Sequence, residues 1–139
     1  MQEDMRDIDR IAKAYDANPW DSFEMKNAEY AEKIKLIQQK VTELIDNKRA
    51  AININAFETN EEIKEYDRKY KQITRLFCAE ADLISIEAKT KSFASVNRKI
   101  AKAFKDINRL FEKENIAISE FLLELKIQQC IAVYYSNKE

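Results

Sequence analysis

The side chains that most often carry out chemistry in proteins are scarce in this chain. Histidine is absent, and the two cysteines, Cys78 and Cys130, lie far apart in the sequence. Histidine is the usual proton carrier near neutral pH and the commonest metal ligand, so Ser-His-Asp and Cys-His arrangements are excluded within one chain. Two distant cysteines do not form a zinc site either. Because both stand among apolar residues, we expect buried free thiols; a disulfide would need an oxidising compartment and close approach of the two residues.

Carboxylates are plentiful, but no pattern assigns them a catalytic role. Bundles of four helices can hold a di-iron site, yet that site uses a Glu-x-x-His motif from each of two helices. Neighbouring acids such as Glu61 and Glu62, or Glu112 and Glu114, offer paired carboxylates in form, although nothing in their spacing singles them out. The chain has no glycine, which excludes the phosphate-binding GxxxxGK and GxGxxG loops. We therefore expect no catalysis, no cofactor and no metal.

Basic residues recur at helical spacing and offer a different chemistry, the binding of phosphates. One row comprises Arg98, Lys102, Lys105 and Arg109, and a second comprises Lys64, Arg68, Lys71 and Arg75. Such rows can follow a nucleic-acid backbone. The chain as a whole carries a net charge of -1, so the alternative is that these are solvated faces answered by acidic faces elsewhere.

Aromatic residues near the ends of expected helices are candidates for binding a protein partner. Trp20 and Phe23 follow the first expected helix, and Tyr134 and Tyr135 lie close to the carboxyl terminus. Exposed aromatic anchors dominate the energy of many interfaces. The same residues would equally suit packing at helix ends, and the sequence leaves both interpretations open.

The composition indicates that helices position these residues. Without glycine the chain lacks the residue that most readily adopts positive φ, which hairpin turns and many helix ends require, so a sheet-rich fold is improbable. The chain is 45% hydrophobic and its 139 residues suit one domain spanning residues 1–139. We predict an all-α fold, an antiparallel bundle of four or five helices of which two or three are long.

Apolar periodicity and capping residues divide the chain into these helices. Residues 1–17 form a short, peripheral first helix, and Pro19 begins a second helix of about 30 residues that runs to Ala51. Asn27 and Lys48 occupy apolar positions of its repeat, where they either fix register or mark an uncovered portion. Thr59 caps a third helix.

Later boundaries are less distinct. The stripe from residue 60 to residue 114 is compatible with one long helix, but we favour a break near Ser92. The last segment, Ile116 to Tyr135, is apolar on nearly every side, which is typical of a helix at the centre of a bundle or at an interface with another chain.

The amino terminus is acidic and has no apolar stretch typical of a secretion signal, and no run approaches the length of a membrane span, so we expect a cytoplasmic protein. The leading hypothesis is a non-catalytic module that binds a protein partner: an adaptor, secretion chaperone, immunity-type inhibitor or structural subunit. The alternative is a small nucleic-acid-binding or phage-type regulatory protein that uses the basic row from Arg98 to Arg109. Either could form a homodimer.

Overall fold

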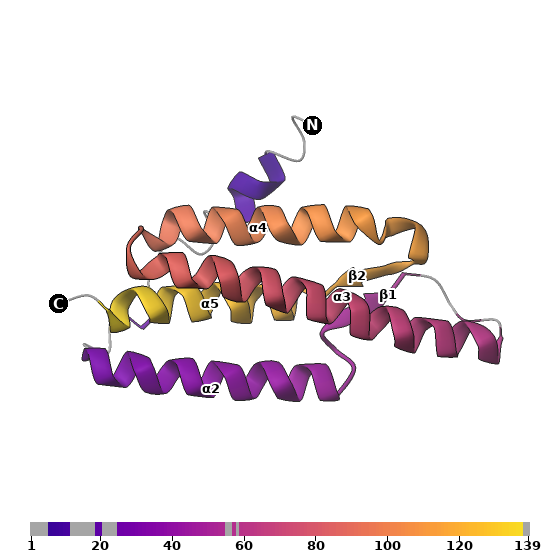
Figure 1. Ribbon diagram of the computed structural model, residues 1–139, viewed down its shortest axis with the longest axis horizontal. Helices are drawn as coiled ribbons and strands as arrows, with labels where there is room; N and C mark the ends of the chain where they lie inside the picture. Colours follow the sequence, from indigo (N-terminus) through magenta and orange to yellow (C-terminus); the bar gives the residue numbers. More distant parts are fainter. Residues whose placement is uncertain (1–5, 12–18, 21–24, 55–56, 58, 138–139) are drawn as a thin grey trace.

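The computed structural model describes residues 6–11, 19, 20, 25–54, 57 and 59–137. These residues form four long helices and one very small sheet, so the predicted all-α class is confirmed (Figure 1). The helices are α2 (Asn27–Asp46), α3 (Asn60–Ile86), α4 (Phe93–Leu110) and α5 (Glu120–Ser136), and the strands are β1 (Ala51–Asn53) and β2 (Ile116–Ile118). Residues 6–11 are helical as well, and we call them the N-terminal segment. The expected end of this first helix near Asp16 lies outside the described residues.

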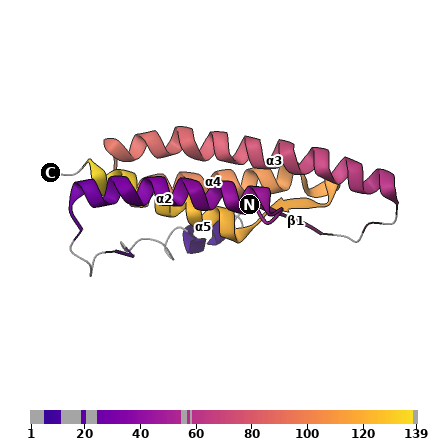
Figure 2. The ribbon, with the colours of Figure 1, turned by 90° about the horizontal axis from the view of Figure 1, so that it is seen from below.

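The four helices run in alternating directions along one axis, which is the predicted antiparallel bundle (Figure 1). α5 lies at its centre and contacts α2, α3 and α4. α2 and α4 lie on opposite sides of the bundle, while the first turns of α3 extend beyond the ends of the other helices (Figure 2). The central place of α5 is the one expected for a helix that is apolar all round.

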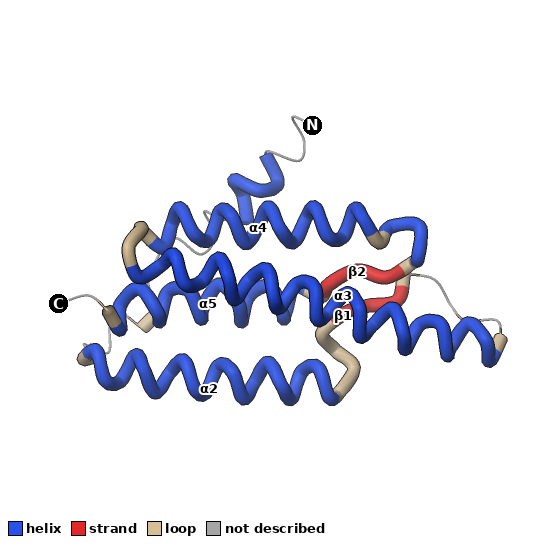
Figure 3. Tube along the Cα trace, viewed as in Figure 1, coloured by secondary structure: helices blue, strands red, loops and turns tan. Residues whose placement is uncertain are grey.

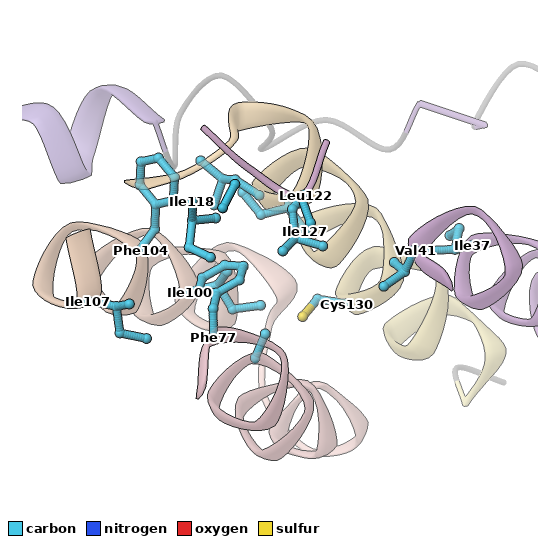
Figure 4. Close-up of a cluster of buried hydrophobic side chains, with 14 of the residues drawn as sticks. Ile37, Val41, Phe77, Ile100, Phe104, Ile107, Ile118, Leu122, Ile127 and Cys130 are labelled. Atoms are coloured by element: carbon cyan, nitrogen blue, oxygen red, sulfur yellow. The ribbon is translucent and has the colours of Figure 1, made fainter. Parts of the chain in front are cut away.

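The core forms where α5 meets its three neighbours. Ile127 and Cys130 of α5 lie between Val41 of α2 and the side chains of Phe77 and Ile100, which come from α3 and α4 (Figure 4). All five residues are less than 9% exposed. Truncating a side chain of this kind to alanine typically destabilises a protein by about 2 to 5 kcal/mol.

Hydroxyl side chains begin three of the helices. The Thr59 hydroxyl accepts a hydrogen bond from the Glu62 amide at 3.1 Å, which confirms the predicted cap. Ser92 caps α4 by accepting from the Ser95 amide at 3.3 Å, so residues 60–114 form two helices with the expected break. Ser119 caps α5 in the same way. Each cap satisfies an amide that the helix itself leaves unpaired, and it stabilises the protein by about 1 kcal/mol.

The predicted bounds of the second helix were wrong at both ends. Pro19 and Trp20 lie in a turn, and α2 begins only at Asn27, whose side chain is exposed. At the other end α2 stops at Asp46 because Lys48 adopts a left-handed conformation, with φ of 61°. The Arg49 amide donates to the Leu44 carbonyl and the Lys48 amide to the Ile45 carbonyl, the pairing of a Schellman motif.

Lys48 therefore stands at the position where glycine is usually found, and the fold supports it there. Its ammonium group lies 4.9 Å from the centre of the Tyr70 ring. The Tyr70 hydroxyl donates to the Ile45 carbonyl at 2.8 Å and accepts from the Ala50 amide at 3.2 Å. These contacts direct the chain away from the helix and into β1. Both polar positions of the expected repeat, Asn27 and Lys48, are exposed, and Lys48 lies beyond the end of α2.

A two-stranded sheet replaces two short segments that the sequence placed in helices or connectors (Figure 3). β1 and β2 pair antiparallel, with Ile52 opposite Ala117. The prediction that a helix begins at Ile116 was wrong, because Asn115 takes φ of 61° and the Asn108 side chain accepts a hydrogen bond from the Ile118 amide at 2.7 Å. β2 packs on α3 and α4, so its isoleucines enter the core in an extended conformation.

Candidate protein-binding site

The antiparallel contact between α2 and α5 brings together aromatic residues from distant parts of the sequence. Tyr30, in the first turn of α2, stacks on Tyr135 near the end of α5 with ring centres 5.3 Å apart. Trp20 contacts Tyr30 edge to face, with ring centres 6.2 Å apart. Tyr134 contacts Tyr135 edge to face at 5.0 Å. We call Trp20, Tyr30, Tyr134 and Tyr135 the aromatic cluster.

The cluster unites three of the four predicted anchors, and its geometry is compatible with both interpretations of them. Trp20, Tyr134 and Tyr135 are each partly buried and pack against the hydrophobic core, as helix-end residues would. They also keep part of their surface at the open end of the bundle. Phe23, the fourth predicted anchor, lies outside the described residues.

Beside the aromatic cluster, the surface of α2 is hollowed. This depression, the α2 hollow, encloses about 380 Å³ and is lined by Trp20, Met25, Glu29, Glu32, Lys33 and Leu36. The four residues from α2 are spaced as one helix face, with Leu36 at its end. Lys33 places its ammonium group 5.7 Å from the centre of the Trp20 ring. The lining is mainly apolar, and the charged groups can contribute at the rim.

Sequence reasoning missed most of the α2 hollow. It assigned Trp20 but placed the apolar face of the helix on a stripe that leaves Leu36 out. Leu36 is 47% exposed and stands among polar residues of α2. An apolar side chain on the charged face of an amphipathic helix was the signal that could have identified this surface.

Arg98, Lys102, Lys105 and Arg109 lie on one face of α4, opposite its buried residues, and we call them the α4 basic row. Acidic groups meet most of this row. The Lys105 ammonium group lies 2.9 Å from the Asp7 carboxylate, and Arg98 forms an ion pair with Asp9. Lys102 pairs with Asp106 at 2.8 Å, one turn along α4. Arg109 is exposed at the end of the helix.

The ion pairs of the N-terminal segment affect the titration of its own carboxylate. The hydrogen bond and the charge of Lys105, with a smaller contribution from Arg10, hold the pKa of Asp7 below its ordinary value of 3.8. The N-terminal segment is thus held to α4 in its ionised form at neutral pH. This is the arrangement expected if the basic row is answered by acids elsewhere in the chain.

Cys130 is buried and Cys78 is partly buried, both in surroundings that disfavour the thiolate. Burial raises the pKa of the Cys130 thiol to about 12, and burial likewise raises the pKa of Cys78. Because the thiolate is the nucleophile, neither residue supplies one at neutral pH. Nearby, the buried ammonium group of Lys126 lies 2.8 Å from the Asp82 carboxylate, an ion pair between α3 and α5.

The neighbouring acids considered for catalysis lie on the outer surface. Glu61 and Glu62 are exposed in the first turn of α3, and Glu114 pairs with Lys69 at 2.9 Å. Within the part of the chain that the structure describes, no three acidic or cysteine side chains gather in a way that could hold a metal ion. Nor is any helix of that part long and apolar enough to cross a membrane.

Fold and surfaces together define the chain as a small all-α bundle with an apolar hollow on one side and a basic row on the other. Residues 27–139 match the family model described as the SNIPE associated domain, and the chain belongs to that family. The match begins at the first residue of α2 and so leaves out Trp20, Met25 and the N-terminal segment. No curated protein and no solved structure matches the chain.

Proposed function

We propose that this chain is a non-catalytic module that binds a protein partner at the α2 hollow. The observation that carries the proposal is the aromatic cluster lying beside a mainly apolar depression on the surface of the bundle. Leu36 leaves 47% of its surface exposed there, and Trp20 is only partly buried. Hot spots of protein interfaces typically combine such an aromatic anchor with a pocket that a partner side chain fills.

The shape and the chemistry of the α2 hollow favour a protein segment as its occupant. A volume of about 380 Å³ accommodates one or two apolar side chains. Small-molecule sites of similar size usually enclose the ligand and present several convergent polar groups. Here the charges of Glu29, Glu32 and Lys33 lie along one helix face, where they would form the polar rim of an interface.

Burial of apolar surface would supply most of the affinity. A leucine or phenylalanine side chain that is fully buried contributes about 1.5 to 3 kcal/mol relative to its exposed state. The rim charges would select the partner by charge complementarity, and with Glu29 and Glu32 both acidic they favour a basic residue beside its apolar anchor. An adaptor, a secretion chaperone, an immunity-type inhibitor and a structural subunit all fit this mode of binding.

The experiment compares two matched double variants. Trp20→Ala with Leu36→Ala removes an aromatic residue and a leucine from the α2 hollow, whereas Phe121→Ala with Leu83→Ala removes the same residue types from exposed sites, 67% and 65% accessible, on other elements. A partner captured from the native host is identified by mass spectrometry and then titrated as a purified protein. We expect the first pair to weaken binding by about 2 kcal/mol or more and the second to leave it unchanged.

Fluorescence gives a direct readout, because Trp20 is the single tryptophan of the chain. Binding at the α2 hollow would shift its emission to shorter wavelength, and Leu36→Ala would reduce the affinity measured by this signal. Circular dichroism of each variant checks that the bundle is intact. Equal losses of affinity in the two double variants would refute the proposal.

Self-association through the same surface is the competing outcome. Light scattering distinguishes a homodimer from a monomer that binds a different protein. We also propose a cytoplasmic location, where Cys78 and Cys130 would stay reduced.

A further inference from the structure

The N-terminal segment lies across α4, on the side of the bundle away from α2 (Figure 1). Two carboxylates hold it there, since Asp7 contacts Lys105 and Asp9 contacts Arg98. The bond between Asp7 and Lys105 joins residues 98 positions apart in the sequence. It is a tertiary contact and not a consequence of local helix geometry.

Apolar contacts accompany these ion pairs. Ile8, between the two aspartates, is 7% exposed, and Ile11 packs against the hydrophobic core. The described part of this helix, residues 6–11, is shorter than the roughly 12 to 15 residues that an isolated helix needs in water. Its helical form therefore depends on the surface beneath it, and it occupies that surface as an acidic amphipathic helix would.

The surface of α4 has a charge that suits such an occupant. The helix carries five basic residues and one acidic residue, Asp106. Arg98 and Lys105, which contact the N-terminal segment, are two turns apart, or about 10 Å along the axis. Lys102 lies between them and pairs with Asp106, whose side chain is 54% exposed.

The family match includes this surface of α4 but not the N-terminal segment that lies on it. Residues 27–139 form the matched domain and include all of α4, whereas the N-terminal segment precedes it. The basic row thus lies within the residues that match the family model, and the N-terminal segment lies outside them.

We infer that the face of α4 bearing Arg98 and Lys105 is a docking site for an acidic amphipathic helix of a partner protein, which the N-terminal segment occupies as an intramolecular competitor. The partner helix would place carboxylates against Arg98 and Lys105 and an aliphatic side chain where Ile8 is buried. A partner helix must outcompete a segment of the same chain, and the effective concentration of such a tethered competitor is typically in the millimolar range. Displacement therefore requires a partner helix that binds α4 much more tightly than the N-terminal segment does. This site lies apart from the α2 hollow and does not depend on it.

The aliphatic contact favours a protein helix over a nucleic acid. Phosphates would satisfy Arg98 and Lys105 but offer no counterpart to the buried side chain of Ile8. Binding to nucleic acid is therefore an outcome that the experiment must be able to detect.

The test uses the full chain with a probe of known sequence. The probe is a fluorescent peptide with residues 1–16 of this chain, and the receptor is either the unmodified chain or the double variant Asp7→Asn with Asp9→Asn. Neutralising the two aspartates weakens the tethered helix without altering α4. We expect the peptide to bind this variant about tenfold more tightly than the unmodified chain, and less tightly as salt is raised.

Charge reversal locates the site. Adding Arg98→Glu and Lys105→Glu to the double variant should abolish peptide binding, and a peptide with Asp7→Lys and Asp9→Arg should restore it. The matched control is Lys64→Glu with Lys71→Glu, two exposed lysines of α3 with the same separation of seven positions, which should leave binding unchanged.

Three results would overturn the inference. The peptide would bind both receptors equally, the α3 control would abolish binding as effectively as the α4 reversal, or the aspartate variant would bind a labelled DNA duplex and not the peptide. The last result would assign the row to nucleic acid instead.

Discussion

The two outer surfaces of the bundle, on α2 and on α4, differ in how their exposed groups are satisfied. On α4 the basic groups find partners within the chain, in Asp7, Asp9 and Asp106. On α2 the side chain of Leu36 stays half exposed beside Trp20. Charges at a surface can be neutralised by one flexible acidic neighbour, whereas apolar surface is removed from water only by a shape that covers it. In our two proposals, the α2 surface is free to bind a partner, whereas the N-terminal segment already occupies the α4 surface.

Truncating a core residue between the two surfaces should have the largest effect on the free energy of unfolding. Ile127 is fully buried in α5, which contacts both α2 and α4. We expect Ile127→Ala to lower the free energy of unfolding by about 3 kcal/mol, measured by urea denaturation. Leu83→Ala, at a 65% exposed position of α3, is the control and should change it by less than about 0.5 kcal/mol. A small effect at Ile127 would mean that the two surfaces do not share one core.

The same core should make stability depend on alkaline pH. The pKa of Cys130 is raised to about 12 from an ordinary value of 9.0, so the folded state keeps the proton that the unfolded state loses. Its contribution to stability is complete below pH 9 and declines above it, by about 1 kcal/mol at pH 10. Unfolding curves between pH 8 and 10.5 should therefore fall less steeply for Cys130→Ala than for the unmodified chain. Identical slopes would show that solvent reaches Cys130.

The N-terminal segment should detach from α4 without unfolding the bundle. In Asp7→Asn with Asp9→Asn we expect amide exchange in residues 6–11 to quicken by roughly tenfold while the thermal midpoint remains unchanged. Lys105 and Arg10 lower the pKa of Asp7 from its ordinary value of 3.8. The stabilisation from this contact is therefore complete above pH 3.8 and is lost as the pH falls through the lower pKa of the folded state. Leu36→Ala, on the opposite surface, should leave exchange in this segment unaffected. If it does not, the two surfaces are coupled.

The end of α2 offers the smallest predicted effect. Lys48 adopts a left-handed conformation that costs a residue with a Cβ atom about 1 kcal/mol. Both Lys48→Gly and Lys48→Ala remove the ammonium group from the Tyr70 ring, but only glycine relieves the backbone. We therefore expect the glycine variant to be more stable than the alanine variant by about 1 kcal/mol in chemical denaturation. The reverse order would mean that φ at this position is not fixed by the bundle.

Boundaries that depend on neighbouring residues were predictable from the sequence. Thr59 and Ser92 cap their helices by hydrogen bonds that span three residues, so the pattern of side chains contains all that is needed. The ends of α2 were not predictable in this way. The hydroxyl of Tyr70, which lies on another helix, holds the chain where α2 stops, and the extended conformation of Ile116 and Ile118 depends on a strand that is distant in sequence.

The sequence by itself determined the helical class and the formation of a basic row on α4, because composition and periodicity act within a few turns of a helix. For α5 it left two places open, the centre of the bundle and an interface with another chain, and the tertiary structure places α5 at the centre. Only the tertiary structure decided that Asp7 and Asp9 meet this row. It alone also placed Trp20, Tyr30 and Tyr135 together beside Leu36. Which faces of two helices meet depends on how all of them share one core, and that shared packing is not written in any single segment.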